Sequence, residues 1–211
     1  MPQLRESMVF IVDDDEDVRE ALSELVESVS LKAQVFASAQ AFLDSYDPDR
    51  PGCLVLDIRM PGMSGLALQR ELKQRGPSLP ILMITAFGDV PTAVQAMKDG
   101  ALEFLQKPFQ DQEFLDRVRG ALERDVAARR AEAVRRDTLA RLTRLTPRER
   151  DVLEQLIRGG ANKAIARELG IGERTVESHR SSIMEKLGAK SLAALINAVL
   201  PHLKEGKLHH D

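Results

Sequence analysis

Acidic residues follow two short apolar segments near the start of this 211-residue chain. Asp13 and Asp14 come directly after Val9–Val12, and Asp57 comes directly after Cys53–Leu56. If both segments are parallel strands of one sheet, their carboxyl ends lie at the same edge and bring the carboxylates together. Repulsion between these charges is costly unless a hard cation is present. Mg²⁺ prefers a few carboxylates, a carbonyl and water, so the spacing predicts a magnesium site.

A hydroxyl and an amine join the same predicted edge. Thr85 ends the apolar segment that begins at Ile81, and Lys107 follows a further segment, Glu103–Leu105. Handling a phosphoryl group requires a nucleophile, a cation that neutralises charge, and hydrogen-bond donors. These residue types at these places therefore indicate phosphoryl chemistry on a carboxylate.

Five β-rich segments alternate with helical patterns up to about residue 120, and this alternation positions the candidate residues. Ser38 and Ser64 stand where N-caps belong, and Gly100 follows a helix as a stop. The alternation predicts a five-stranded parallel sheet with helices on both faces, a doubly wound, flavodoxin-like α/β domain. The expected strands are Val9–Val12, Ala33–Phe36, Cys53–Leu56, Ile81–Thr85 and Glu103–Leu105, and the expected helices are Val18–Val29, Ala39–Ser45, Leu66–Arg75 and Pro91–Lys98.

From Asp111 to about Arg144 the pattern changes to one long polar helix. Its apolar residues are spaced by three and four, and no proline stands between Gln110 and Thr146. We expect the last helix of the first domain to continue into a helical linker. Such a linker either forms a coiled coil or is a solvated helix, and the sequence leaves both open.

Residues 146–200 are predicted to form a small all-α domain. Thr146 and Glu149 have the spacing of a capping box, with proline at the first helical position between them. Two of the following helices, 163–169 and 173–187, are separated by a short turn that contains glycine, which is typical of a helix-turn-helix. The boundary signals are Asn162 as a cap, Gly170-Ile171-Gly172 as the turn, Ser191 as a cap, and Pro201 as the stop of a last helix, Leu192–Leu200.

Charge divides the chain into an acidic and a basic part, although the net charge is only -3. Residues 1–123 carry 12 Lys and Arg against 21 Asp and Glu, whereas residues 124–211 carry 18 against 12. The basic part is the candidate for binding a polyanion, although a solvated helical surface gives a similar count. The expected domains are 1–122, a helical linker over 123–144, and a helix-turn-helix domain over 145–211.

Composition narrows the class of protein. No apolar segment approaches the roughly 20 residues that a membrane span needs, and no signal peptide is visible. The single cysteine, Cys53, lies in an apolar segment and suits a reducing cytoplasm as buried filler. Neither a nucleotide-binding loop nor a catalytic triad pattern appears, so the sequence gives little support to an enzyme.

Four segments of the chain resemble, in order and spacing, the receiver domain of two-component response regulators. They read VFIVDDDEDVR, CLVLDIRMPGMSG, ILMITAFGDVPTAVQAMKDGA and EFLQKPF. A pair of aspartates after a strand is common, whereas all four segments together are specific. The resemblance covers residues 8–122 and implies a domain that a sensor histidine kinase phosphorylates on an aspartate.

The resemblance implies a role for each matching acidic residue. Asp57 would be the phospho-acceptor. Asp14, Asp57 and the carbonyl of Arg59 would bind Mg²⁺ directly, and Asp13 would bind it through water. Asp15 has a plainer interpretation as an exposed acid at the start of the first helix, where the helix dipole favours it.

The remaining implied roles concern the phosphoryl oxygens and the switch. Lys107 would hold one oxygen and precede a cis peptide bond to Pro108. Thr85 would donate a hydrogen bond to another oxygen. Phe104 would be the aromatic residue that rotates inward when Thr85 moves.

The last third of the chain resembles the LuxR-type helix-turn-helix. LTPRER, NKAIARELGI and RTVESH are its recognisable parts, within residues 145–191. The segment GDVPTAVQAMKDGALEFLQKPF further resembles the FixJ-type branch of receiver domains. Together these resemblances imply a regulator that binds double-stranded promoter DNA.

The second helix of this motif can be read on a helical wheel. Val176, Ile183 and Leu187 form one stripe, which must face the core of the domain. The opposite, polar face suits the DNA major groove. In the family, base contacts come from positions matching Glu177, Ser178 and Ser181. Arg174 also lies on this polar face. The flanking residues expected to contact phosphates are Lys163, Thr175, His179 and Lys186. The stem of Arg180 is expected to pack near the core stripe while its guanidinium reaches the DNA backbone.

Several of these residues have a second interpretation. Glu177 either accepts from a cytosine amino group or balances Arg180 or Arg174, because its charge is wrong for phosphate. His179 could pack at the edge of the core. Ser182 and Glu185 are expected to be merely solvated.

The leading hypothesis is a cytoplasmic transcription factor that dimerises when a histidine kinase has phosphorylated it and that acts with RNA polymerase. The fourth helix should form the dimer contact, through Val90, Val94 and Lys98. The apolar last helix favours a second contact between output domains. A helix-turn-helix that binds protein instead of DNA is the alternative, and the basic charge of residues 124–211 argues against it.

Overall fold

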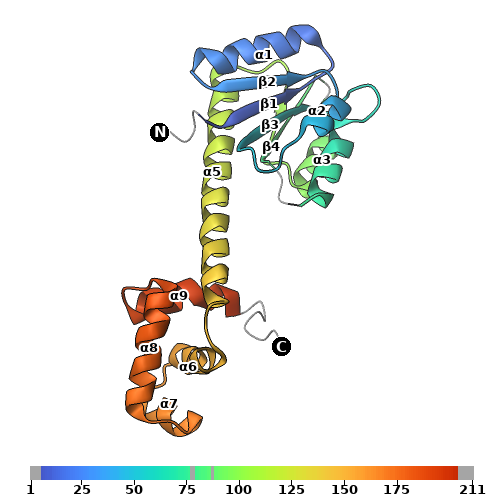
Figure 1. Cartoon of the computed structure of the whole chain (residues 1–211). Coiled ribbons are helices and arrows are strands. Elements are labelled where there is room, and N and C mark those ends of the chain that lie inside the picture. Colours follow the sequence, from blue (N-terminus) through green and yellow to red (C-terminus); the bar gives the residue numbers. More distant parts are fainter. Residues whose placement is uncertain (1–5, 77–78, 87, 204–211) are drawn as a thin grey trace. The chain divides into compact units, whose positions relative to one another are not determined.

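The computed structural model describes residues 6–76, 79–86 and 88–203, and the chain divides into two compact units, Met1–Arg130 and Ala131–Asp211. The first unit holds a five-stranded sheet in the order β2-β1-β3-β4-β5, with every neighbouring pair parallel (Figure 1). This is the predicted fold. Its elements are β1 (Met8–Val12), α1 (Glu16–Ser28), β2 (Lys32–Phe36), α2 (Ala39–Ser45), β3 (Gly52–Asp57), α3 (Gly65–Gln74), β4 (Ile81–Thr85), α4 (Val90–Asp99), β5 (Glu103–Gln106) and α5 (Asp111–Leu142).

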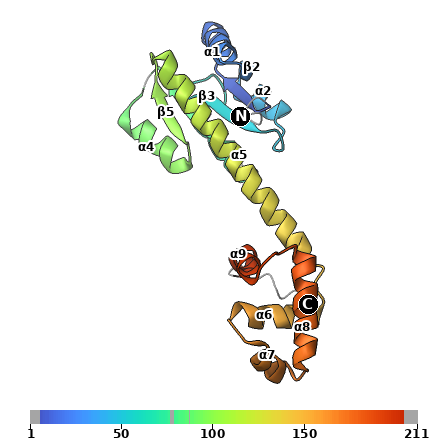
Figure 2. The same cartoon turned by 90° about the vertical axis from the view of Figure 1, so that its left-hand side faces the viewer.

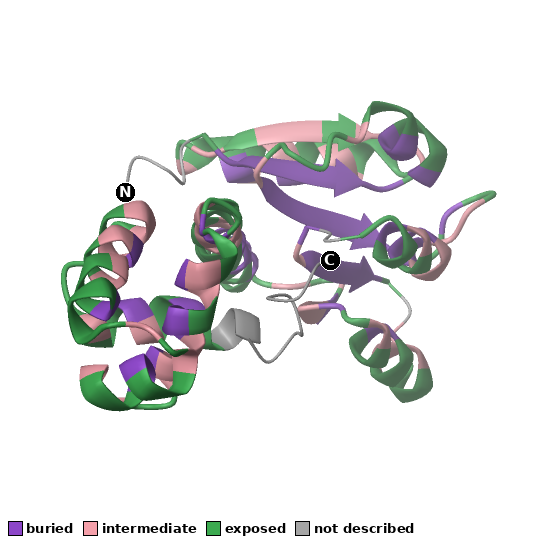
Figure 3. Ribbon diagram, turned by 60° about the horizontal axis from the view of Figure 1, so that its bottom comes forward, coloured by how far each residue is buried: buried purple, intermediate pink, exposed green. Residues whose placement is uncertain are grey.

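The core lies on both faces of this sheet. Every residue of β1, β3 and β4 is buried, and the central strands are coloured accordingly in Figure 3. Their aliphatic residues alternate between two clusters because successive side chains of a strand point to opposite faces. Phe10 and Leu54 pack with α2 and α3, whereas Ile11 and Val55 pack with α1 and α5. Burial on both faces explains why these strands read as continuous apolar segments.

Side chains cap the helices of the first unit at the expected places. Ser38 and Ser64 accept the capping hydrogen bonds of α2 and α3, and Gly100 ends α4 with a φ of 106°. Asp15 caps α1 by accepting from the backbone N–H groups of Asp17 and Val18. These caps fix the helix starts that follow β1 and β3.

Helix α5 contacts the rest of the first unit beyond Leu122, its last buried apolar residue in the core of that unit. Asp125 is buried, and its Oδ2 accepts from the backbone N–H of Gly52 at 2.9 Å and from Arg129 Nε at 2.8 Å. The guanidinium of Arg129 donates to the carbonyls of Pro48, Asp49 and Arg50. The first unit therefore holds this helix past residue 122, where the domain was expected to end.

The second unit is helical, as Figure 2 shows, and its buried apolar residues form a separate core. Leu142 and Leu145, at the end of α5 and just after it, pack into this core with Val152, Leu153 and Ile165. The helices are α6 (Pro147–Ile157), α7 (Asn162–Leu169), α8 (Glu173–Leu187) and α9 (Leu192–Leu203). No helix in the described part of the chain is long and apolar enough to cross a membrane.

Two of the predicted boundaries in the second unit are wrong. Ala161, not Asn162, is the N-cap of α7 and makes no side-chain capping bond, while Asn162 is the first helical residue. Helix α9 continues through Pro201 to Leu203. The proline was expected to stop the helix because it lacks an N–H and its ring crowds the preceding turn, but the helix extends two residues beyond it. The capping box of Thr146 and Glu149 is confirmed.

Candidate functional site

Two carboxylates and one ammonium meet at the carboxyl edge of the sheet. Lys107 Nζ lies 2.6 Å from Asp13 Oδ2 and 3.1 Å from Asp57 Oδ1. Asp13 is 1% exposed and Asp57 is 5% exposed, so both charges are shielded from bulk water. β1 and β3 are adjacent and parallel, which brings their two ends together as the sequence predicted.

The backbone holds these groups in place. Asp57 Oδ2 accepts from the backbone N–H of Arg59 at 2.7 Å, and Asp13 Oδ1 accepts from that of Asp15 at 3.0 Å. The Lys107 N–H donates to the carbonyl of Thr85 at 2.8 Å, and the Lys107–Pro108 peptide bond is cis, as the receiver resemblance implied. Each charged side chain is thus attached to the end of a strand of the sheet.

The other predicted receiver residues lie near this edge with different exposures. Thr85 is buried at the end of β4, beside Gln106 in the register of β4 with β5. Phe104 is half-buried on the sheet face that α3 and α4 cover. Asp14 is exposed.

Electrostatics distinguish Asp57 from an ordinary surface aspartate. Burial raises the pKa of Asp57, the Lys107 ammonium opposes this without cancelling it, and the charge of Asp13 raises the pKa further. Burial lowers the pKa of Lys107, but the hydrogen bonds that its ammonium donates to Asp13 and Asp57, together with their negative charges, outweigh burial and leave that pKa above its usual value. Lys107 is therefore charged at neutral pH, and two carboxylates share one ammonium.

The donor set at this edge suits a hard divalent cation in its chemistry. It consists of the oxygens of Asp13 and Asp57, the exposed carboxylate of Asp14 and the carbonyl of Arg59 near the end of β3. Among the described residues, no group of three or more His, Cys, Asp or Glu side chains is already gathered as a metal site. Oxygen ligands alone and an excess of negative charge fit Mg²⁺.

The second candidate site is the outer face of α8. Val176 and Ile183 are buried in the core of the second unit and Leu187 is half-buried, so the predicted stripe is confirmed. Ser181 Oγ donates to the backbone carbonyl of Glu177 at 3.1 Å. The exposed predicted residues are Lys163 on α7 and Arg174, Thr175, Glu177, Ser178 and Ser181 on α8, while His179 is half-buried.

A cluster of charged and polar side chains near the C-terminal end of α8 was not predicted from the sequence. Glu149 is buried, and Lys186 Nζ lies 2.8 Å from Oε1 and 2.7 Å from Oε2 of its carboxylate. Ser182 Oγ donates to Oε1 at 2.6 Å, so the prediction that Ser182 is merely solvated is wrong. Burial would raise the pKa of Glu149, but the hydrogen bonds from Lys186, Ser182 and Thr146 outweigh burial and lower it to about 2.

Arg180 also has a partner inside the second unit. Its Nη1 donates to Asn162 Oδ1 at 2.6 Å, which ties the start of α7 to the middle of α8. The sequence signal for this contact was ambiguous because Asn162 is equally suited to capping. Arg180 and Lys186 thus both contribute to holding α8 in place.

Exposed apolar residues gather on α4. Val90 is 76% exposed, Val94 45% and Met97 46%, so the face predicted for dimerisation is open to solvent. Met97 was not predicted to belong to it, although it lies one turn beyond Val94 on the same side of the helix.

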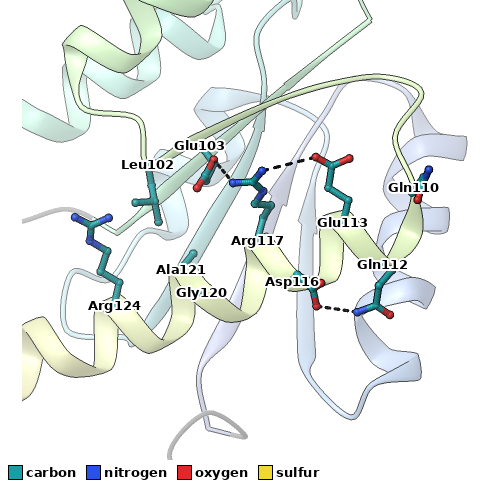
Figure 4. A pocket seen from close by; sticks show the side chains of 10 residues that line it. All are labelled: Leu102, Glu103, Gln110, Gln112, Glu113, Asp116, Arg117, Gly120, Ala121 and Arg124. Carbon is teal, nitrogen blue, oxygen red and sulfur yellow. Dashed lines mark hydrogen bonds and ion pairs between the residues drawn. The ribbon is translucent and has the colours of Figure 1, made fainter.

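A hollow of about 700 Å³ lies between β5 and α5, and none of the predicted site residues lines it (Figure 4). Arg117 pairs within it with Glu103 at 2.9 Å and with Glu113 at 3.8 Å. Gln112 donates to Asp116 at 2.7 Å. Its polar groups are largely satisfied by one another, which is typical of a surface groove.

The fold and the sheet-edge site define a receiver domain, and comparisons with known proteins agree. Residues 9–119 match the response regulator receiver domain, and residues 143–199 match the luxR family of bacterial regulatory proteins. The chain belongs to the response regulators with a LuxR-type DNA-binding domain, and it is a transcriptional regulator rather than an enzyme.

Relatives of similar length support this. The chain is 47% identical to the transcriptional regulatory protein FixJ of Azorhizobium caulinodans over 91% of both chains, and 44% identical to the response regulator protein TodT of Pseudomonas putida over 95% of this chain and 88% of TodT. A solved structure of the response regulator StyR matches with a TM-score of 0.82 and 47% identity over 93% of this chain and 99% of that one. Full-length FixJ from B. japonicum matches with a TM-score of 0.58 and 42% identity over 92% of this chain and 96% of that one.

Proposed function

We propose that this regulator accepts a phosphoryl group on Asp57 from a histidine kinase, and that phosphorylation makes it dimerise and bind promoter DNA in the cytoplasm. The observation that carries the proposal is the buried Asp57 carboxylate at the end of β3, 3.1 Å from the Lys107 ammonium. A carboxylate held there has a raised pKa and an excess of negative charge around it. The carboxylate is a nucleophile, and a bound cation would offset the excess negative charge around it.

In the phosphorylation step, a carboxylate oxygen of Asp57 attacks phosphorus. The P–N bond of the donor phosphohistidine breaks, and the histidine leaves with its electron pair and takes a proton. Lys107 holds a phosphoryl oxygen in place of one of its present carboxylate partners, and Thr85 donates to another oxygen. Asp13, Asp14, Asp57 and the Arg59 carbonyl would bind Mg²⁺, which neutralises charge as the phosphoryl group transfers.

Dimerisation is proposed to use the exposed face of α4. Val90, Val94 and Met97 are open apolar residues and Lys98 borders them. β4 ends at Thr85, and four residues separate Thr85 from the start of α4 at Val90. A movement of Thr85 would therefore be passed to this face through a short segment. The apolar helix α9 offers a second contact between output units.

DNA reading is proposed for the exposed face of α8. Glu177, Ser178 and Ser181 would contact bases, and Lys163 and Thr175 would contact phosphates. Arg174 and His179 would flank them. Lys186 and Arg180 were also expected to reach DNA. Because each already has a partner in the second unit, we propose that their first role is to hold α8, and that phosphate contacts use what remains exposed.

Selection from a randomised double-stranded DNA library tests the proposal. The full chain is treated with acetyl phosphate and Mg²⁺, and its affinity for the selected sequence is compared with that of the untreated chain. We expect phosphorylation to raise the affinity by roughly tenfold or more, a typical allosteric coupling. Asp57→Asn, the matched control, should bind like the untreated chain. Equal affinities of treated and untreated chain would refute phosphorylation control, and no selected sequence at all would refute DNA binding.

A further inference from the structure

A buried glutamine joins α3 to α4. Gln69 is 2% exposed, and its Nε2 donates to the backbone carbonyl of Ala96 at 3.0 Å. Its Oε1 accepts no hydrogen bond from any residue in the described part of the chain. A buried amide with one unpaired acceptor costs stability relative to an apolar side chain of similar size. Stability alone therefore does not account for a glutamine at this position.

The Ala96 carbonyl links α4 both to α3 and to the segment before β5. It also accepts from the backbone N–H of Ala101 at 3.0 Å, in the segment that leads from α4 into β5. Ala96 is the one buried residue of α4, all ten of whose residues are described. The bond from Gln69 therefore attaches α4 to α3 at the one fully buried residue of α4.

Other contacts from α3 go to the same end of α4. Lys73 Nζ donates to the backbone carbonyl of Asp99 at 3.4 Å, and Arg70 Nη1 lies 3.8 Å from Asp99 Oδ2. At the opposite end of α4, Val90 and Pro91 are exposed and Thr92 is half-buried. These three contacts between α3 and α4 all involve the last turn of α4, whereas its first turn adjoins the segment after Thr85.

From this arrangement we infer that Gln69 is the pivot of α4. The inference rests on the proposed phosphorylation of Asp57. When Thr85 moves toward the phosphoryl group, the first turn of α4 moves with it, and the bond from Gln69 to Ala96 keeps the last turn in place. The helix therefore tilts, and the exposed residues Val90 and Val94 change position more than Met97. Gln69 is a positioning residue that converts a shift at Thr85 into a reorientation of the dimer face.

Hydrogen exchange of the full chain, with and without beryllofluoride and Mg²⁺, tests the pivot. In the wild-type chain, beryllofluoride should change exchange over residues 90–94 and leave residues 97–101 protected. In Gln69→Leu, residues 97–101 should exchange roughly three- to tenfold faster, about the value of one hydrogen bond, and should respond to beryllofluoride as strongly as residues 90–94. Gln74→Leu, an exposed change on the same helix, should behave like wild type.

A second variant and a second readout keep the outcome clear. The side chain of Lys73 is exposed, so Lys73→Met should not disturb the core. This variant should show the same effect more weakly, and it tests the pivot even if Gln69→Leu does not fold. Phosphate labelling from acetyl phosphate should proceed at the wild-type rate in every variant, while the beryllofluoride-driven gain in dimer should shrink severalfold in Gln69→Leu.

The possible failures are distinguishable. If wild-type α4 changes equally at both ends, or if Gln69→Leu leaves residues 97–101 unaffected, Gln69 is not a pivot. Faster exchange with an undiminished gain in dimer reduces Gln69 to a structural residue and overturns its role in signalling. If the wild-type chain takes up no phosphate, the proposed function itself fails, and the pivot fails with it.

Discussion

Each unit of this regulator contains a buried cluster of lysine and carboxylate, and the two clusters differ in their charge balance. In the first unit, the Lys107 ammonium is shared by Asp13 and Asp57. In the second, Lys186 faces the single carboxylate of Glu149. The pKa of Asp57 is raised, chiefly by burial, whereas the pKa of Glu149 is lowered to about 2 because its hydrogen bonds outweigh burial.

The charge balance of each cluster determines whether it is suited to chemistry. Glu149 accepts from Lys186, Ser182 and the backbone N–H of Thr146, so its two oxygens are fully used and its negative charge is matched. Asp57 and Asp13 together carry more negative charge than Lys107 can offset. A cation or a change of partners relieves the first cluster and would only disrupt the second. We therefore interpret one as reactive and the other as structural.

Substitution of Asp14 and of Asp15 should have opposite consequences for phosphate labelling. Asp14→Ala should abolish phosphate labelling from acetyl phosphate because it removes a proposed Mg²⁺ ligand. Asp15→Ala should label normally, although loss of the α1 cap should cost about 1 kcal/mol of stability. Labelling with radioactive acetyl phosphate measures both. Normal labelling of Asp14→Ala would remove Asp14 from the metal site.

The next effect concerns the structural cluster. Glu149→Ala leaves the Lys186 ammonium half-buried without its partner, so the second unit should lose roughly 2–4 kcal/mol of stability. Hydrogen exchange of α6 and α8 in the full chain measures this loss. Phosphate labelling of Asp57 should be unchanged. A stable Glu149→Ala variant would show that this cluster does not hold α8.

A pH titration sharpens the same contrast. The folded pKa of Glu149, about 2, lies below its ordinary value of 4.5, so its contribution is complete above pH 4.5 and is lost as the pH falls toward 2. We expect the second unit to lose roughly 2 kcal/mol in this window, after allowance for solvent screening. Glu149→Gln should remove that part of the pH dependence. If wild type and Glu149→Gln lose stability in parallel, Glu149 does not carry the effect.

The smallest effects concern DNA. Replacing Lys163 by Ala should weaken binding to every sequence alike and lower the salt slope by about one, because one phosphate contact is lost. Ser178→Ala or Ser181→Ala should change preference at particular base pairs by roughly 1–3 kcal/mol and leave the slope nearly unchanged. Affinities for an operator library at several salt concentrations separate these outcomes. Uniform losses in the serine variants would mean that this face does not read bases.

The sheet-edge site was predictable because topology brings it together. Parallel strands send their carboxyl ends to one edge, so the positions of Asp13, Asp57, Thr85 and Lys107 after apolar segments were enough to place them there. The exposed face of α8 was predictable for a similar reason, since the helical period places Val176 and Ile183 in the core and leaves Ser178 outside.

Contacts between elements that share no periodic pattern could not be predicted. Lys186 and Glu149 are separated by 37 residues and Asp125 and Gly52 by 73, and nothing in either pair's local sequence indicates a partner. Gln69 stands on an amphipathic helix, where a polar residue normally suggests solvent, yet it is buried. Glu149 was correctly predicted in a capping box. Its partners on α8, Ser182 and Lys186, could not be predicted because the capping motif contains no signal for them.

If Asp57 is the reactive carboxylate, the phosphoryl group must be found on its side chain. The full chain is treated with acetyl phosphate and Mg²⁺, the acyl phosphate is reduced with borohydride, and the modified residue is identified by mass spectrometry of its peptides. We expect one modified residue, Asp57, and none in Asp57→Asn or without Mg²⁺. Modification of Asp13 or Glu149, or of Asp57 to the same extent without Mg²⁺, would contradict this expectation.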